Sequence, residues 1–255
     1  MNAALMKTIP MTFEEVFALL EQWGSEGARR IYARQGAGDK QFGVTLGKLR
    51  GFAKRLKINH SLAMPLWATG NADAMILATM IMDPKQLSKQ NIERMMGSLT
   101  YFKLVDELVD NVVAKTGFAD ELRGCWINSS EEMMGRAGWK LEISRILDNG
   151  RDSTGFDRLL GKIEAEILSA PRRKQECMNR CLVEIGVHFP AWTQKCIQVG
   201  ERLGRFDMTP VPKGCTSSYA PEWIAAVLKR QKTPKPQQHP RRQQRSDRPI
   251  PMRNR

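Results

Sequence analysis

Apolar residues recur at helical spacing along most of this chain, and this periodicity limits the possible folds more than any other feature. In the first periodic segment Phe13, Val16 and Leu20 form one face, while Thr12 and Glu15 have the spacing of a capping box. About a dozen segments of roughly 10–18 residues follow the same pattern. No alternating run is long enough to indicate a sheet. The sequence therefore predicts an all-α protein.

The predicted helices are joined by short connections such as TGN, DPKQ, NSS and DNG. Short connections place consecutive helices side by side as antiparallel pairs. Such pairs would recur roughly every 35–45 residues, which is the period of HEAT and armadillo repeats. We therefore predict a HEAT-like helical-repeat solenoid, with a globular helical bundle as the alternative. A solenoid would present an extended concave surface to a partner.

Charge is unevenly distributed along the chain. Residues 229–255 hold ten Lys or Arg and one Asp, a net charge of +9, which leaves +4 of the total of +13 for residues 1–228. This last segment, KRQKTPKPQQHPRRQQRSDRPIPMRNR, is rich in Pro and Gln and too poor in apolar residues to form a core. We predict a helical-repeat domain at 1–228 and a disordered basic tail at 229–255. Such a tail favours a polyanionic partner, with a purely solubilising role as the alternative.

Several classes of protein are not indicated. There is no run of about 18 apolar residues, and the start MNAALMKTIPMTFEEV lacks the pattern of a secretion signal. We therefore expect a cytoplasmic, nucleoid-associated protein that neither spans a membrane nor is secreted. The five cysteines include no CxxC pair, and no Gly-rich phosphate loop, HExxH motif or nucleophile elbow occurs. We predict no metal site and no cofactor.

Two segments resemble a known family. Residues 42–84, FGVTLGKLRGFAKRLKINHSLAMPLWATGNADAMILATMIMDP, resemble the N-terminal half of AlkD-like DNA alkylation repair proteins. Residues 214–224, GCTSSYAPEWI, look like the closing pattern of the same family. The resemblance implies a HEAT-like solenoid that holds duplex DNA in a basic concave groove. It also implies removal of cationic N3- or N7-alkylated purines without the base flipping of other enzymes that act on bases.

The resemblance also suggests catalytic residues. Active members of the family have a W-x-x-x-D pattern, and the matching stretch FKLVD places Phe102 and Asp106 at its two ends. The family arginine falls at Arg136 in MMGRAGW, with Arg145 as the alternative. A second tryptophan of the family has no counterpart in CMNRCLVEIGVHF, and Trp192 lies on the next predicted helix. A carboxylate near C1′ would stabilise the positive charge that forms on the sugar as the base leaves.

Helical phase gives an independent view of Asp106. In YFKLVDEL the apolar residues include Leu104, Val105 and Leu108, and Asp106 falls on the opposite, polar stripe with Glu107. The pattern by itself favours a solvated surface charge. The resemblance favours a position that faces DNA.

Two groups of cations are candidates for DNA contacts. Lys48 and Arg50 lie on the polar face of a predicted helix that begins after Thr45, and an ordinary solvated face explains them equally well. Arg172, Arg173 and Lys174 open a later helix, where cations are unfavourable next to the helix dipole. An anion nearby would offset that cost, so we expect a phosphate contact there.

Three hypotheses follow. The first is a monomeric glycosylase of base excision repair that acts on alkylated duplex DNA, with Asp106 as the catalytic residue, Phe102 lining the cleft and Arg136 holding a phosphate. The second is a non-catalytic DNA-binding protein with the same fold. The third is a helical-repeat scaffold for a protein partner.

Overall fold

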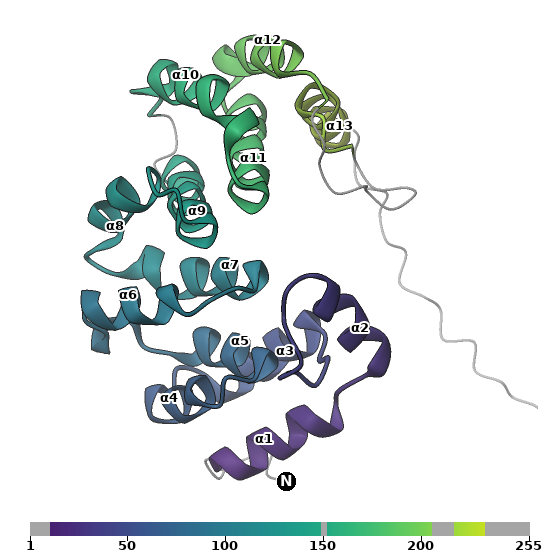
Figure 1. Cartoon of the computed structure of the whole chain (residues 1–255), viewed down its shortest axis with the longest axis vertical. Helices are drawn as coiled ribbons and strands as arrows, with labels where there is room; N and C mark the ends of the chain where they lie inside the picture. The colour runs from purple at the N-terminus through teal and green to yellow at the C-terminus, as the bar shows by residue number, and fades with distance from the viewer. Residues whose placement is uncertain (1–10, 149–151, 206–216, 233–255) are drawn as a thin grey trace, which may run out of the picture.

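The computed structural model describes residues 11–148, 152–205 and 217–232, and they form an open arc of helices (Figure 1). Helices are the regular elements of this described part of the chain, and it contains no strand. This confirms the predicted all-α class and the arrangement as a helical-repeat solenoid. No helix among the described residues is long and apolar enough to cross a membrane.

The first half of the arc contains seven α-helices and one 3₁₀ turn. In chain order they are α1 (Phe13–Gln22), α2 (Glu26–Arg34), α3 (Leu46–Leu56), α4 (His60–Ala68), α5 (Ala72–Ile81), η1 (Pro84–Gln86), α6 (Lys89–Gly97) and α7 (Phe102–Asn111). The second half follows as η2 (Val113–Lys115), α8 (Ala119–Trp126), α9 (Glu132–Asp148), α10 (Phe156–Glu166), η3 (Ile167–Ser169), α11 (Arg172–His188), η4 (Pro190–Trp192), α12 (Thr193–Leu203) and α13 (Ala220–Lys232).

The helices form an inner and an outer row. Along the inner row α3, α5, α7, α9, α11 and α13 each pack against the next. Helices α4, α6, α8 and α10 lie behind them, on the outside of the arc (Figure 1). Side chains on the free face of the inner row therefore line the concave side of the molecule.

Two hydrophobic clusters hold the arc together, and α9 belongs to both. Ala137 and Leu141 complete the cluster that begins at α1. Trp139 and Ile143 belong to the cluster that continues to α13. Close packing of α9 on α8 requires Gly138, because a Cβ there would lie only 2.1 Å from the backbone nitrogen of Ile127. The two halves thus share one buried helix.

Several helix boundaries follow directly from local sequence. Thr12 and Glu15 form the predicted capping box of α1, and Ser88 caps α6 in the same way. Pro84 lies beyond the end of α5, at the first position of a 3₁₀ turn, as its missing N–H favours. Thr45 precedes α3 as predicted, but its side chain makes no capping hydrogen bond.

The structure also contains a helix that the pattern did not predict. Helix α2 follows Ser25, whose hydroxyl accepts a hydrogen bond from the Ala28 N–H, but none of its residues is buried. Ala28, Ile31 and Tyr32 do have the spacing of an apolar helix face, but this face spans little more than one turn, which is a short periodic signal. At the other end, α13 runs to Lys232, so residues 229–232 are helical rather than part of the predicted tail. The rest of the predicted tail lies outside the described residues.

Candidate nucleic-acid interface and active site

Three inner helices bring the family-like residues together on the concave side. Helix α7 carries Phe102 and Asp106, α9 carries Arg136, and α11 carries Arg173 and Glu176. These five residues form what we call the ion-pair cluster. All of them except Glu176 are candidates from the sequence, but their interactions were not predicted.

Asp106 and Arg136 form a two-pronged ion pair. Arg136 Nε lies 2.7 Å from Asp106 Oδ1, and Arg136 Nη2 lies 2.7 Å from Asp106 Oδ2. Paired charged hydrogen bonds of this kind fix both the distance and the plane of the carboxylate. The Asp106 side chain remains 26% exposed, whereas the Arg136 side chain is only 9% exposed. Asp106 therefore lies on the polar stripe, as helical phase predicts, with its charge reachable from the concave side.

Arg136 is fully engaged by the protein. Its Nη1 donates to the Arg173 carbonyl oxygen at 3.0 Å and to Glu176 Oε2 at 3.2 Å. Burial by itself lowers the pKa of Arg136, but the hydrogen bond and charge of Asp106 outweigh it and raise the pKa. Arg136 thus holds Asp106 in place rather than extending toward a phosphate. Arg145, the alternative candidate, instead pairs with Glu142 at 2.6 Å.

Phe102 lies between two guanidinium groups. The Cζ atom of Arg136 is 4.8 Å from the centroid of its ring, and the Cζ atom of Arg173 is 4.2 Å from it. Both distances are in the range of cation–π attraction. The ring therefore orders the two arginines beside Asp106. Trp192 does not reach this cluster, because it packs edge-on against Phe156 in the second half of the arc.

The anion at the N-terminus of α11 is a carboxylate of the protein, Glu132, where the sequence suggested a phosphate. The Arg173 N–H donates to Glu132 Oε1 at 2.8 Å, and Arg173 Nη1 pairs with Glu176 at 2.7 Å. Arg172 is exposed at the start of the helix. Lys174 is buried, and its ammonium donates to the Ser129 carbonyl oxygen at 2.9 Å. Burial lowers the pKa of Lys174, and the buried ammonium is not placed to contact a partner molecule.

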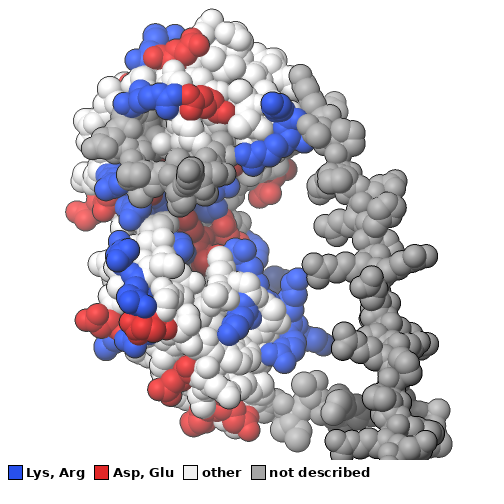
Figure 2. Space-filling model, turned by 90° about the vertical axis from the view of Figure 1, so that its right-hand side faces the viewer, with Lys and Arg blue, Asp and Glu red and all other residues white. Residues whose placement is uncertain are grey.

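Lys48 and Arg50 are exposed on α3, earlier in the inner row. Lys48 Nζ lies 3.4 Å from the Trp23 carbonyl oxygen, a long and exposed contact. Arg50 pairs with Glu107 at 2.9 Å and keeps 60% of its side chain exposed. Figure 2, which looks toward the open side of the arc, shows Lys and Arg on both sides of a hollow that contains Asp and Glu.

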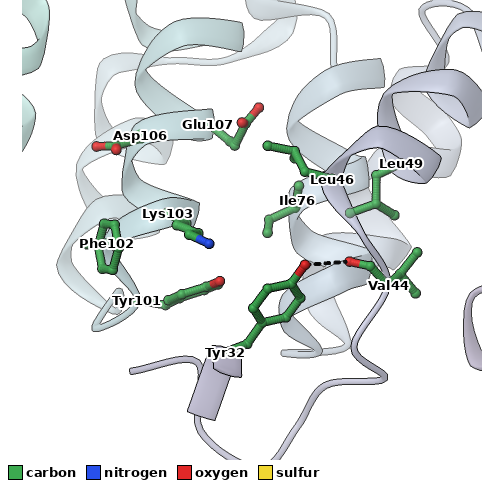
Figure 3. A pocket seen from close by; sticks show the side chains of 10 residues that line it. All are labelled: Tyr32, Val44, Leu46, Leu49, Ile76, Tyr101, Phe102, Lys103, Asp106 and Glu107. Atoms are coloured by element: carbon green, nitrogen blue, oxygen red, sulfur yellow. Dashed lines mark hydrogen bonds between the residues drawn. The ribbon is translucent and has the colours of Figure 1, made fainter. Parts of the chain in front are cut away.

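A cavity that the sequence did not predict opens beside α7. It has a volume of about 220 Å³ and is lined by Tyr32, Val44, Leu46, Leu49, Ile76, Tyr101, Phe102, Lys103, Asp106 and Glu107 (Figure 3). Tyr32 comes from α2, whose apolar face is too short for this side of the cavity to have been predicted from periodicity.

The buried cysteines do not form a binding site. Cys177 and Cys181 are buried on α11, whereas Cys125 is exposed, and burial raises the pKa of Cys177 to about 12. Among the described residues there is no group of three or more His, Cys, Asp or Glu side chains placed to bind a metal ion.

Known proteins resemble this chain over most of its length. An uncharacterized protein of Listeria innocua is 23% identical over 225 residues, which cover 86% of this chain and 97% of that protein. An uncharacterized protein of Listeria monocytogenes is 22% identical over 225 residues, which again cover 86% of this chain and 97% of that protein.

A solved structure matches with a TM-score of 0.76 and 28% identity, over 87% of this chain and 95% of that chain. It represents a new family of proteins related to the HEAT-like repeat DNA glycosylases with affinity for branched DNA structures. The predicted HEAT-like fold is thereby confirmed. The family described as DNA alkylation repair enzyme matches residues 16–224. This chain therefore belongs to the family of DNA alkylation repair enzymes.

Proposed function

We propose that this protein binds duplex DNA on its concave side and excises N3- or N7-alkylated purines by hydrolysis. The observation that carries the proposal is the Asp106 carboxylate, which two hydrogen bonds from Arg136 hold at a partly exposed position on an inner helix. Family membership supports a role in DNA repair.

The chemistry needs a fixed negative charge and water. An alkylated purine is cationic, and the bond between C1′ and its ring nitrogen breaks with the electron pair leaving on the base. Positive charge then forms on the sugar, where the Asp106 carboxylate would stabilise it. Water adds to C1′ and gives up a proton, to Asp106 or to solvent. The preorganised geometry matters because Arg136 holds the carboxylate before the charge appears.

The cations supply the DNA contacts in this proposal. Lys48 and Arg50 lie at one part of the inner row and Arg172 at another, and all three are exposed. Arg173 is 22% exposed beside Phe102. Phosphate neutralisation by such side chains is independent of base sequence, which suits a repair protein that must search duplex DNA.

The proposal is tested by measuring release of free 7-methylguanine and 3-methyladenine from methylated duplex DNA. We expect release by the unaltered protein, and a roughly 100- to 1,000-fold slower rate in Asp106→Asn, because the charge is lost while the side-chain shape is kept. Asp110→Asn is the matched control, since Asp110 lies one turn later on α7 and pairs with Lys140 at 2.8 Å. Equal rates in the two variants would contradict a catalytic role for Asp106.

A non-catalytic DNA-binding protein is the second candidate. Two observations favour it: the position of the second family tryptophan has no aromatic residue in CMNRCLVEIGVHF, and the solved structure that this chain resembles has affinity for branched DNA. Duplex binding without any base release would support this candidate over the glycosylase. The expectation of a monomer stays a prediction, which light scattering of the purified protein would test.

A further inference from the structure

The cavity beside α7 shares Phe102 and Asp106 with the ion-pair cluster, but its other lining residues have no role in the proposed excision. Its residues come from α2, α3, α5 and α7, whereas the partners of Asp106 come from α9 and α11. In Figure 3, Tyr101 and Lys103 point toward Tyr32 and the aliphatic side chains, while Phe102 and Asp106 lie on the opposite side of α7. The cavity therefore adjoins the ion-pair cluster at Phe102 and Asp106 and extends from there toward Tyr32 and the aliphatic side chains.

The cavity wall is mostly apolar and aromatic. Leu46, Leu49 and Ile76 form one side, and the Tyr32 ring forms another (Figure 3). Lys103 places its ammonium 5.0 Å from the centroid of the Tyr32 ring. At about 220 Å³ the cavity is smaller than the roughly 300–1,000 Å³ typical of sites for drug-sized ligands. It is suited to a single flat ring system.

One polar group that faces the cavity makes no hydrogen bond within the described residues. The Tyr101 side chain is buried, with 4% of the residue exposed, and its hydroxyl has no hydrogen-bond partner among the described residues. The hydroxyl points into the cavity (Figure 3). Burial raises the pKa of Tyr101, so the hydroxyl stays protonated and able to donate. The hydroxyl is therefore available to donate a hydrogen bond to a ligand that enters the cavity.

The opposite wall is held rigidly before any ligand binds. The buried Asp73 carboxylate accepts hydrogen bonds from the backbone N–H groups of Phe42, Gly43 and Val44 at 2.7, 2.9 and 3.1 Å. The Tyr32 hydroxyl donates to the Val44 carbonyl oxygen at 3.3 Å. These bonds tie the loop before α3 to α2 and α5, and preorganisation of this kind reduces the cost of binding.

We propose that this cavity binds one unpaired nucleobase of a DNA strand lying on the concave side. The base would stack on the Tyr32 ring, and the Tyr101 hydroxyl and the Lys103 ammonium would donate hydrogen bonds to its edge. Arg50, exposed on α3 and paired with Glu107 of the cavity wall, is available to a phosphate beside the base. A nucleobase of DNA fits better than an uncharged metabolite because Arg50 and Lys103 place positive charge at the cavity.

The donors also predict which base is preferred. A lysine ammonium donates only, so the edge it meets must present acceptors. Thymine presents O4, and guanine presents O6 and N7, whereas adenine combines an acceptor with an amino donor. The cavity should therefore favour thymine or guanine over adenine. The inference rests on the proposed binding of DNA, but it does not require excision.

The experiment compares three labelled duplexes by fluorescence anisotropy: one fully paired, one with a single-thymine bulge, and one whose bulge is an abasic tetrahydrofuran. We expect the thymine bulge to bind about tenfold more tightly than the abasic bulge, in the range of one base–aromatic stacking contact. An adenine bulge should bind between the two. Failure to bind any of the three duplexes would overturn the proposed DNA binding as well, whereas equal binding of both bulges would overturn the cavity proposal only.

Substitutions inside and far from the cavity test whether the preference for the thymine bulge arises there. Leu46→Trp should fill the cavity from a partly buried position and abolish the preference for the thymine bulge over the abasic one. Leu168→Trp is the matched control, because Leu168 is 61% exposed in η3, in the second half of the arc, and should keep the preference. Tyr101→Phe, which removes only the hydroxyl, should reduce the preference several-fold. A preference unchanged in Leu46→Trp would show that the base binds elsewhere and overturn the proposal.

Discussion

The two sides of α7 differ in how their charged and polar side chains are paired. On one side the ion-pair cluster surrounds Arg136 with Asp106, Glu176 and a carbonyl oxygen, so each of its charges has a partner. On the other side Lys103 has an aromatic ring, and the Tyr101 hydroxyl has no partner among the described residues. The ion pairs around Arg136 hold the Asp106 carboxylate in place, whereas the Tyr101 hydroxyl is available to bind a ligand.

The largest expected effect comes from removing the buried cation of the ion-pair cluster. Arg136→Met should lower the free energy of unfolding by about 3–5 kcal/mol, because it leaves Asp106 and Glu176 without their shared partner. Lys103→Met is the matched control across α7. Burial lowers the pKa of Lys103, so its charge is unfavourable there, and its loss should change stability by less than about 1 kcal/mol. Urea unfolding measures both, and equal losses would show that the two sides do not differ as described.

An intermediate effect is expected at the wall of the cavity. Asp73→Asn should cost about 2–3 kcal/mol, because an amide oxygen replaces a charged acceptor of three backbone N–H groups. Asp110→Asn, at an ion pair whose carboxylate side chain is 45% exposed, should cost about 0–1 kcal/mol. Thermal or urea unfolding compares the two. If Asp73→Asn is as stable as the control, the wall is not held by this carboxylate and the cavity is less rigid than proposed.

The smallest expected effect concerns salt dependence. The arginines of the ion-pair cluster already have carboxylate partners, so exposed Lys48, which contacts a carbonyl oxygen, should contribute more to phosphate binding. Lys48→Gln should reduce the slope of log affinity against log salt concentration by roughly 1, as expected for one lost phosphate contact. Lys162→Gln, on the outer helix α10 and paired with Glu166, should leave the slope unchanged. A slope that changes equally in both variants would place DNA on a different surface.

Much of the fold could be predicted because its signals are local. The capping residues Thr12 and Ser88, the stop at Pro84 and the apolar stripe of α7 are each visible within a few residues of sequence. The helix that was missed, α2, has no buried residue, and its apolar face of Ala28, Ile31 and Tyr32 spans little more than one turn. The inward turn of Lys174 could not be predicted either, because the Ser129 carbonyl oxygen that accepts its hydrogen bond lies 45 residues away in sequence.

The sequence by itself determined the helical class and the place of Asp106 on a polar stripe, because helix formation and phase depend on neighbours three and four residues apart. Only the tertiary structure decided that Arg136 would hold Asp106, since these residues are 30 positions apart and meet through the packing of α7 on α9. It likewise decided that α2 and α7 would enclose a cavity. Contacts between helices depend on how whole faces pack, and no short stretch of sequence records that geometry.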